Sequence, residues 1–152
     1  MSRDIPLAEI TLRRYEKPYQ TDKRELCKKI CLSLGILQPG DSRDIMVDVL
    51  LVLIEARQKK EAISSLEIKK RVLEKRKEHH SEMNGIAESN IRRQLKRLRD
   101  LMLVDKKENL YNISEFASLE ELFENKIEKF LVPQIMQRVK EYIAEIEKTN
   151  QI

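Results

Sequence analysis

The sequence predicts a mostly α-helical protein with one small β-hairpin. Apolar residues recur at helical spacing along most of the 152 residues, and residues 102–114 alternate as short strands do. With 41% apolar residues, the chain is long enough for one hydrophobic core with appendages but short for two independent domains. We therefore expect one domain, preceded by an extended arm over residues 1–20 and followed by a helical region over residues 118–148.

A first helix is expected within residues 21–36. Asp22 lies three residues before Glu25, which is capping-box spacing, and Gly35 suits a helix end. Cys27 and Cys31 share one face of this helix, so buried thiols are the simplest interpretation. The same face carries Leu26, Ile30 and Leu34.

A second helix is expected after the break LQPGDS, from Asp41 or Ser42 through RDIMVDVLLVLIEARQKK. Apolar residues lie on nearly all sides of this segment between Val49 and Ile54. An apolar surface that wide indicates a central, buried helix.

A third helix is expected to begin near Ser64, because Ser64 and Glu67 have the spacing of a capping box. It ends in the polar stretch KEHHSEMNG, in which Asn84 and Gly85 predict a turn.

The next stretch, ESNIRRQLKRLRDLMLVDKKENLYNIS, begins as a helix and ends as a hairpin. Apolar residues at steps of 4, 3 and 4 form one stripe to be buried, made of Ile91, Leu95, Leu98 and Met102. Two extended runs then follow, from Met102 to Lys106 and from Leu110 to Ser114.

The side of this helix opposite the apolar stripe is basic. Asp100 is the one acid there, and Glu88 can pair with Arg92. A surface helix without a partner usually mixes acids among its bases, so this face either meets a polyanion or is a solvated charge cluster. The candidate contacts are Ser89, Asn90, Arg92, Arg93, Lys96, Arg97 and Arg99.

The order of these elements resembles the winged helix-turn-helix superfamily. The resemblance covers about residues 42–114, with SSLEIKKRVLEKR in the position of the second helix, AESNIRRQLKRLRDLMLV in that of the recognition helix and DKKENLYNIS in that of the wing. It implies a winged helix-turn-helix domain over residues 41–114. Members of the superfamily bind DNA most often, whereas others bind RNA or proteins.

The resemblance also implies roles for single residues. Its base-reading positions fall on Ser89, Asn90, Arg92, Arg93 and Lys96. Among these, Asn90 suits adenine and Arg93 suits guanine through a bidentate contact. Arg97 and Arg99 are better placed for phosphates, which fix position without reading sequence.

The predicted wing departs from a strong DNA-binding pattern. Lys106 and Lys107 are candidate contacts, but Asp105 and Glu108 flank them. The segment also has no arginine to enter a minor groove.

Residues 118–148 predict a long helix with an apolar stripe that must pack against another surface. Ser118 and Glu121 repeat the capping-box spacing, and Pro133 either kinks this helix or separates two. The helix either folds back on the domain or pairs with a second subunit. We favour a homodimer, because a winged domain has limited surface to cover extra helices. The dimer contacts would be Phe130, Ile135, Val139, Ile143 and Ile146.

The N-terminal arm carries basic and aromatic side chains that suit either of two surfaces. It packs on its own or its partner's domain, or it anchors the protein in a ribonucleoprotein. The candidate arm contacts are Arg13, Arg14, Tyr15, Lys17 and Tyr19.

No enzymatic activity, cofactor or metal is expected. The chain has three glycines and no phosphate-cradling loop, and its histidines, His79 and His80, are adjacent and far from the cysteines. The longest apolar run, VLLVLI, is too short to span a bilayer, and the N-terminus lacks the apolar block of a secretory signal, so we expect a cytosolic protein.

Three functions remain open from the sequence. The first is a dimeric DNA-binding transcriptional regulator. The second is a ribosome- or RNA-associated factor that docks on rRNA or ribosomal protein through the basic helix and the arm, and joins or blocks subunits. The third is a protein-binding scaffold.

Overall fold

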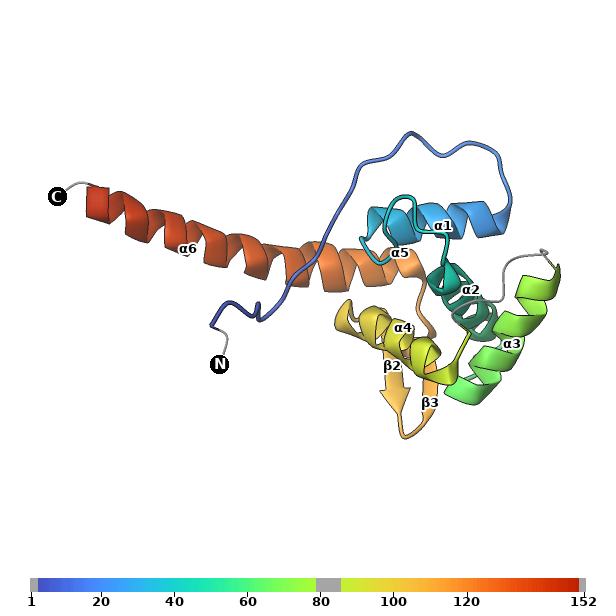
Figure 1. The fold of residues 1–152 in the computed structure, drawn as a ribbon. Coiled ribbons are helices and arrows are strands. Elements are labelled where there is room, and N and C mark those ends of the chain that lie inside the picture. The colour runs from blue at the N-terminus through green and yellow to red at the C-terminus, as the bar shows by residue number, and fades with distance from the viewer. Residues whose placement is uncertain (1–2, 79–85, 151–152) are drawn as a thin grey trace.

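Helix α2 (Ile45–Gln58) is the centre of the fold in the computed structural model, which describes residues 3–78 and 86–150 (Figure 1). Every residue from Ile45 to Ile54 is buried. Helices α1 (Lys23–Ser33), α3 (Ser65–Glu78) and α4 (Glu88–Asp100) pack against α2. The prediction of a central, buried second helix is confirmed.

The start of α2 differs from the prediction of Asp41 or Ser42, because the helix begins only at Ile45. The Asp41 carboxylate accepts the backbone N–H of Arg43 at 2.9 Å, which forms a turn instead of a helix start. The residue just before the helix, Asp44, makes no capping hydrogen bond with its side chain. Its carboxylate binds arginines of neighbouring helices instead.

The capping predictions for the other helices are confirmed. The Asp22 carboxylate accepts the N–H of Glu25 at 2.8 Å at the start of α1. The Ser64 hydroxyl accepts the N–H of Glu67 at 3.1 Å at the start of α3. Each contact satisfies a backbone donor that the first helical turn leaves without a partner.

The N-terminal arm crosses the end of α1 at Gly35. This residue has a φ of +69°, and a Cβ added there would lie 2.4 Å from the Thr11 Cβ. Glycine is therefore required both for the left-handed backbone and for the close approach of the arm. The backbone N–H of Arg13 donates to the Ser33 carbonyl at 2.8 Å, which holds the arm against α1.

The small sheet has three antiparallel strands in the order β1-β3-β2. The hairpin is formed by β2 (Val104–Lys107) and β3 (Leu110–Ile113), close to the predicted runs. Strand β1 (Ile63–Ser64) was not predicted; it pairs with β3, with Ile63 opposite Tyr111. Its partner is distant in the chain, so no local pattern in the sequence reveals it.

Met102 lies beyond the end of α4, contrary to the prediction, although its half-buried side chain packs against the core. The helix ends at Asp100, and Met102 has a φ of +62°. The N–H of Leu103 then donates to the Leu98 carbonyl at 3.1 Å, and the N–H of Met102 donates to the Arg99 carbonyl at 2.8 Å. This pattern closes the helix and turns the chain directly into the hairpin.

One continuous long helix follows the hairpin and the short 3₁₀ turn Ser114–Phe116. It comprises α5 (Leu119–Leu122), the π-helical segment η2 (Phe123–Leu131) and α6 (Val132–Asn150), which extends away from the body (Figure 1). Pro133 neither ends nor splits it. The N–H of Val132 donates to Ile127, five residues back, so the wider turns before Pro133 accommodate a residue that lacks a donor.

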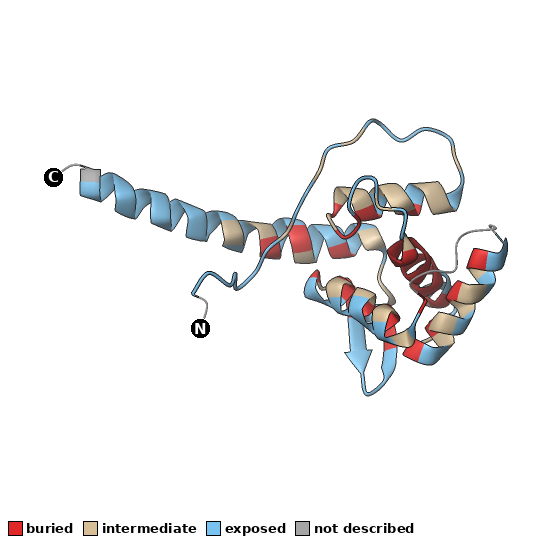
Figure 2. Ribbon diagram, viewed as in Figure 1, coloured by how far each residue is buried: buried red, intermediate tan, exposed pale blue. Residues whose placement is uncertain are grey.

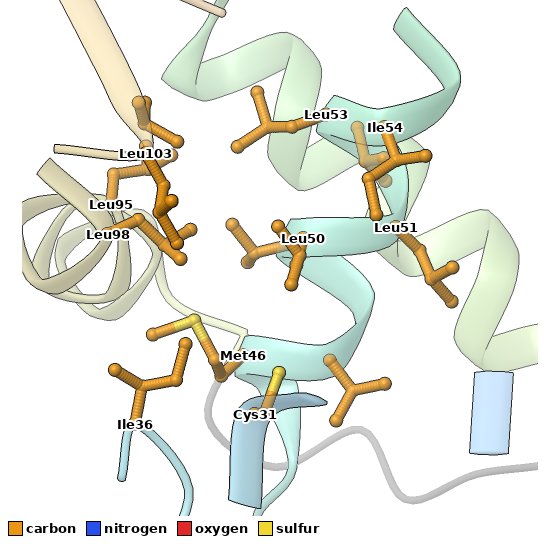
Figure 3. Packing of buried hydrophobic residues seen from close by; sticks show 14 of the residues in the cluster. Cys31, Ile36, Met46, Leu50, Leu51, Leu53, Ile54, Leu95, Leu98 and Leu103 are labelled. Atoms are coloured by element: carbon orange, nitrogen blue, oxygen red, sulfur yellow. The ribbon is translucent and has the colours of Figure 1, made fainter. Parts of the chain in front are cut away.

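The core lies where α1, α3, α4 and the sheet meet α2. Figure 2 shows α2 buried over most of its length, whereas α4 is buried along one side and exposed along the other. In Figure 3, Leu95 and Leu98 of α4 face Leu50 of α2. The predicted turn at Asn84 and Gly85, with His79 and His80, lies outside the described residues.

Candidate nucleic-acid interface

Helix α4 is held against the body by its apolar stripe. Ile91, Leu95 and Leu98 are completely buried. At its first turn the Glu88 carboxylate accepts a hydrogen bond from the Ser65 hydroxyl at 3.0 Å, which ties the start of α4 to the start of α3. These contacts fix which side of the helix faces solvent.

The exposed side of α4 carries most of the predicted contacts. Ser89, Arg92, Arg93, Lys96 and Arg99 are exposed, and Asn90 and Arg97 are half-buried. The helix has five basic and two acidic side chains in thirteen residues. The surplus of positive charge is therefore carried on a rigid element in water.

Both acids of α4 pair with cations on the same helix. Arg92 lies 2.8 Å from the Glu88 carboxylate, as predicted, and Lys96 lies 3.2 Å from Asp100. These side chains are exposed, and such pairs contribute only about 0.3–0.5 kcal/mol, so a phosphate can replace either acid at little cost. Arg99 has no ion pair among the described residues.

Arg97 is the predicted contact that the tertiary structure draws inward. One guanidinium nitrogen donates to the side chain of Gln94 at 3.2 Å, and the other donates to the Gly35 carbonyl at 3.4 Å. Arg97 thus links α4 to the end of α1.

Asn90 accepts hydrogen bonds from Arg93 at 3.4 Å and from Gln94 at 3.1 Å.

The hairpin that follows α4 exposes its two lysines. Strand β2 contacts α4, and both Lys106 and Lys107 are exposed. The ammonium of Lys106 lies 5.7 Å from the centre of the Tyr111 ring, across the hairpin. Asp105 accepts a hydrogen bond from Ser114 at 3.1 Å, so this acid is engaged within the hairpin.

The arm divides into an anchored and an exposed part. The Arg13 guanidinium donates to the carbonyls of Leu32 and Leu37, at 2.9 and 3.1 Å, and to the Gln38 side chain at 2.6 Å. It therefore binds backbone oxygens at and beyond the end of α1. Arg14, Lys17 and Tyr19 are exposed.

Tyr15 packs against α1 through a lysine. The Lys29 ammonium lies 4.7 Å from the centre of the Tyr15 ring and 2.6 Å from the Glu16 carboxylate. The hydrogen bond from Lys29 lowers the pKa of Glu16, and the same bond raises the pKa of Lys29. These contacts fasten the arm to its own chain.

The predicted dimer contacts lie along η2 and α6. Phe130, Val139, Ile143 and Ile146 are exposed, and Ile135 is half-buried where α6 leaves the body. Each of these side chains except Ile135 is open to solvent over about half of its surface.

The sequence analysis missed a buried ionic cluster, which we name the Arg–Asp cluster. It consists of Arg24 of α1, Asp44 and Asp48 at the start of α2, and Arg76 of α3. Arg76 lies 2.6 Å from Asp44 and 2.9 Å from Asp48, and Arg24 lies 3.0 Å from Asp44 and 3.3 Å from Asp48. Asp48 is fully buried, and Arg76 is 2% exposed.

The ionic state of the Arg–Asp cluster follows from its hydrogen bonds. Burial raises the pKa of Asp44, but the hydrogen bonds from Arg76 and Arg24 outweigh burial and hold the pKa below its usual value. For Arg24, burial lowers the pKa, but the hydrogen bonds to Asp48 and Asp44 and their negative charges raise it by more. The pKa of Arg24 is therefore above its usual value. The one signal in the sequence was Asp48, an acid inside an otherwise apolar run.

The two cysteines are buried. Cys27 donates to the Val47 carbonyl at 3.6 Å. Its hydrogen bond with Cys31, together with burial, raises the pKa of the Cys31 thiol. Leu26 and Ile30, predicted on the same face, are instead about 40% exposed and line a cleft. No group of three potential metal ligands occurs within residues 3–78 and 86–150.

Comparison with family models, curated proteins and solved structures finds no match for this chain. In the described part of the chain, no helix is long and apolar enough to cross a bilayer.

Proposed function

We propose that this chain is a dimeric nucleic-acid-binding protein of the winged helix-turn-helix type, and that it acts as a DNA-binding transcriptional regulator. The observation that carries the proposal is the exposed side of α4. Arg92, Arg93, Lys96 and Arg99 lie there, opposite the buried stripe, on the helix that contacts strand β2 of the hairpin. A helix of this kind can enter a major groove while its cations meet phosphates.

Two further features support the winged-helix component. Helices α2, α3 and α4 and the hairpin follow one another in the order that the resemblance implies. The sheet order β1-β3-β2 brings the hairpin back to the start of α3. The base-reading roles of Ser89, Asn90, Arg92, Arg93 and Lys96, and the phosphate roles of Arg97 and Arg99, are part of the proposal.

The experiment that tests this function identifies the nucleic acid. The tagged full-length protein is purified from its own cells at low salt, and the bound nucleic acid is sequenced. We expect defined genomic fragments. Fluorescence anisotropy with one such duplex and with a scrambled duplex then measures specificity. Equal affinity for the two would contradict the role of a sequence-specific regulator.

A second candidate function has its own supporting observation. Ile5 and Leu7 in the arm are 71% and 95% exposed. An extended arm with exposed apolar side chains suits insertion into a protein or ribonucleoprotein surface. In this case α4 would lie on rRNA or ribosomal protein, and the dimer would join or block subunits. Small-subunit rRNA in the purification would support this candidate and contradict the first.

A protein-binding scaffold is the remaining possibility. It predicts that protein alone is recovered with the tagged chain. It also predicts that nuclease treatment before purification leaves the recovered proteins unchanged.

A further inference from the structure

Helix α6 carries a broad apolar stripe that the described part of its own chain covers only at its base, where Val132 and Ile135 are half-buried, and leaves uncovered from Met136 onward. At 100° per residue, its members lie within an arc of about 120°. They are Val132, Ile135, Met136, Val139, Tyr142, Ile143 and Ile146. All residues from Met136 to Thr149 are exposed. A helix that leaves the body with such a stripe in water lacks the tertiary packing that stabilises most helices.

The width of the stripe indicates what should cover it. A two-stranded coiled coil uses a narrow seam of alternating positions, whereas a stripe wider than about 100° is typical of a helix that packs on a broader surface. Two helices that form the walls of a groove offer such a surface. The receiving site should therefore be an apolar groove of helical length.

The body of the same chain has such a groove. It is a cleft of about 990 Å³ that is lined by α1, by the beginning of the long helix and by residues 15–19 of the arm. Its walls carry Leu26 and Ile30 of α1 and Phe123 of η2, which are 40%, 36% and 37% exposed. Leu50 and Leu103 line it from the core. Contiguous exposed apolar side chains along a cleft are typical of a site that binds a protein or a ligand.

We propose that α6 of a second copy fills this groove, so that two chains pair through antiparallel long helices. This inference rests on the dimer in the proposed function and specifies how it is built. Exposed apolar side chains continue along the long helix from the groove to the tip, at Phe123, Phe130, Met136, Val139, Ile143 and Ile146. Each chain therefore offers both the groove and the stripe, as a two-fold interface requires.

The register follows from this continuity. When Ile143 of one copy packs on Phe123 of the other, the two-fold axis passes near Pro133. The two Phe123 side chains then lie about 30 Å apart along the helices, at 1.5 Å per residue. Each tip covers the partner's groove, and the two bodies lie on opposite sides of the axis.

Charge at the rim of the groove agrees with this register. Glu128 lines the groove, and Lys140 lies beside the stripe of α6. Both are exposed, and neither has an ion pair among the described residues. In the antiparallel pairing, Lys140 of one copy lies at about the level of Glu128 of the other. The contact supplies each charge with a partner of opposite sign.

Cross-linking distinguishes this dimer from a parallel coiled coil. Chains with Leu26→Cys and chains with Ile146→Cys, carrying different tags, are co-expressed and treated with a bis-maleimide of about 10 Å, the spacing of packed helices. We expect a cross-link between the two kinds of chain. We expect none between two Ile146→Cys chains, because the tips lie about 40 Å apart at 1.5 Å per residue. Wild-type protein is the control, since Cys27 and Cys31 are buried.

The opposite pattern, with Ile146→Cys cross-linked to itself and not to Leu26→Cys, would overturn the proposal while leaving a dimer. A monomer mass in light scattering at micromolar concentration would overturn the dimer as well, and would leave the groove to a small apolar molecule. Neither result concerns nucleic-acid binding, which is measured separately by anisotropy.

A matched pair of substitutions tests the groove itself. Phe123→Ser removes an apolar side chain from the wall, and Leu66→Ser removes one that is 63% exposed on α3, away from the groove. We expect Phe123→Ser to weaken dimerisation by about 10-fold or more and Leu66→Ser to leave it unchanged. Equal dimerisation constants for the two variants would contradict the proposal.

Discussion

The Arg–Asp cluster and the exposed side of α4 use the same chemistry in opposite surroundings. In the Arg–Asp cluster, Arg76 and Asp48 are buried and Arg24 and Asp44 are half-buried between α1, α2 and α3, and the arginines bind the aspartates. On α4, Arg92, Arg93, Lys96 and Arg99 are exposed to water, and so are the ion pairs of Arg92 and Lys96.

The difference separates stabilising charges from charges available for binding. A buried arginine without its carboxylates would be an uncompensated charge, so each member of the Arg–Asp cluster depends on the others. An exposed cation is hydrated in either case, and its contribution to stability is small. We therefore expect substitutions in the first region to affect folding and those in the second to affect binding.

The largest effect is expected from Arg76→Met. It removes the more deeply buried of the two arginines that pair with Asp44 and Asp48 and leaves both carboxylates to Arg24, and breaking such a buried pair costs about 3–5 kcal/mol. Chemical denaturation followed by circular dichroism measures the free energy of unfolding. Lys77→Met, at the exposed neighbouring position of α3, is the control and should change it by less than about 0.5 kcal/mol. Equal stability of the two variants would remove the distinction between buried and exposed charge.

The contribution of the Arg–Asp cluster to stability should also depend on pH. The pKa of Asp44 is lower in the folded chain than its usual value of 3.8. The stabilisation by Asp44 is therefore complete above that usual value and is lost as the pH falls through the lower folded value. We expect Asp44→Asn to reduce the loss of stability on acidification below about pH 5, as measured by denaturation at a series of pH values. Parallel curves for Asp44→Asn and wild type would count against this assignment.

Replacing Arg92, Arg93 and Lys96 together with Ala should weaken nucleic-acid binding by about 10-fold or more and leave folding intact. Each lost phosphate contact lowers the slope of log K against log salt by about 0.9 on duplex DNA. A variant with Lys23, Lys77 and Lys148 replaced by Ala has the same net charge and is the control. Identical salt slopes for the two variants would show that α4 is not the binding face.

The smallest effect separates two arginines of α4. Arg97→Ala removes the hydrogen bond to the Gly35 carbonyl and should cost about 1 kcal/mol of stability. Arg99→Ala, at an exposed position, should cost less than about 0.5 kcal/mol and act on binding alone. Thermal unfolding and anisotropy on both variants test this division. A larger loss of stability in Arg99→Ala would reverse it.

The elements that the sequence predicted well depend on local patterns. The N-cap side chains of Asp22, Ser64 and Ser118 lie within one helical turn of the backbone N–H groups whose hydrogen bonds they accept. The burial of α2 was predictable because apolar residues lie on nearly all of its sides. Strand β1 escaped prediction because two residues form a strand only when a distant hairpin pairs with them. Leu26 and Ile30 were predicted on the buried face of α1, but they line a groove that no element of the body fills in the described residues.

The sequence by itself determined that α4 has an apolar side and a basic side, because helical periodicity places residues on faces without reference to the rest of the chain. Only the tertiary structure decided which basic residues remain available. Arg13 binds Leu32 and Leu37, Arg24 and Arg76 bind Asp44 and Asp48, and Arg97 reaches Gly35. These contacts join residues far apart in the chain, and burial, which depends on all elements at once, determines the energy of each charge.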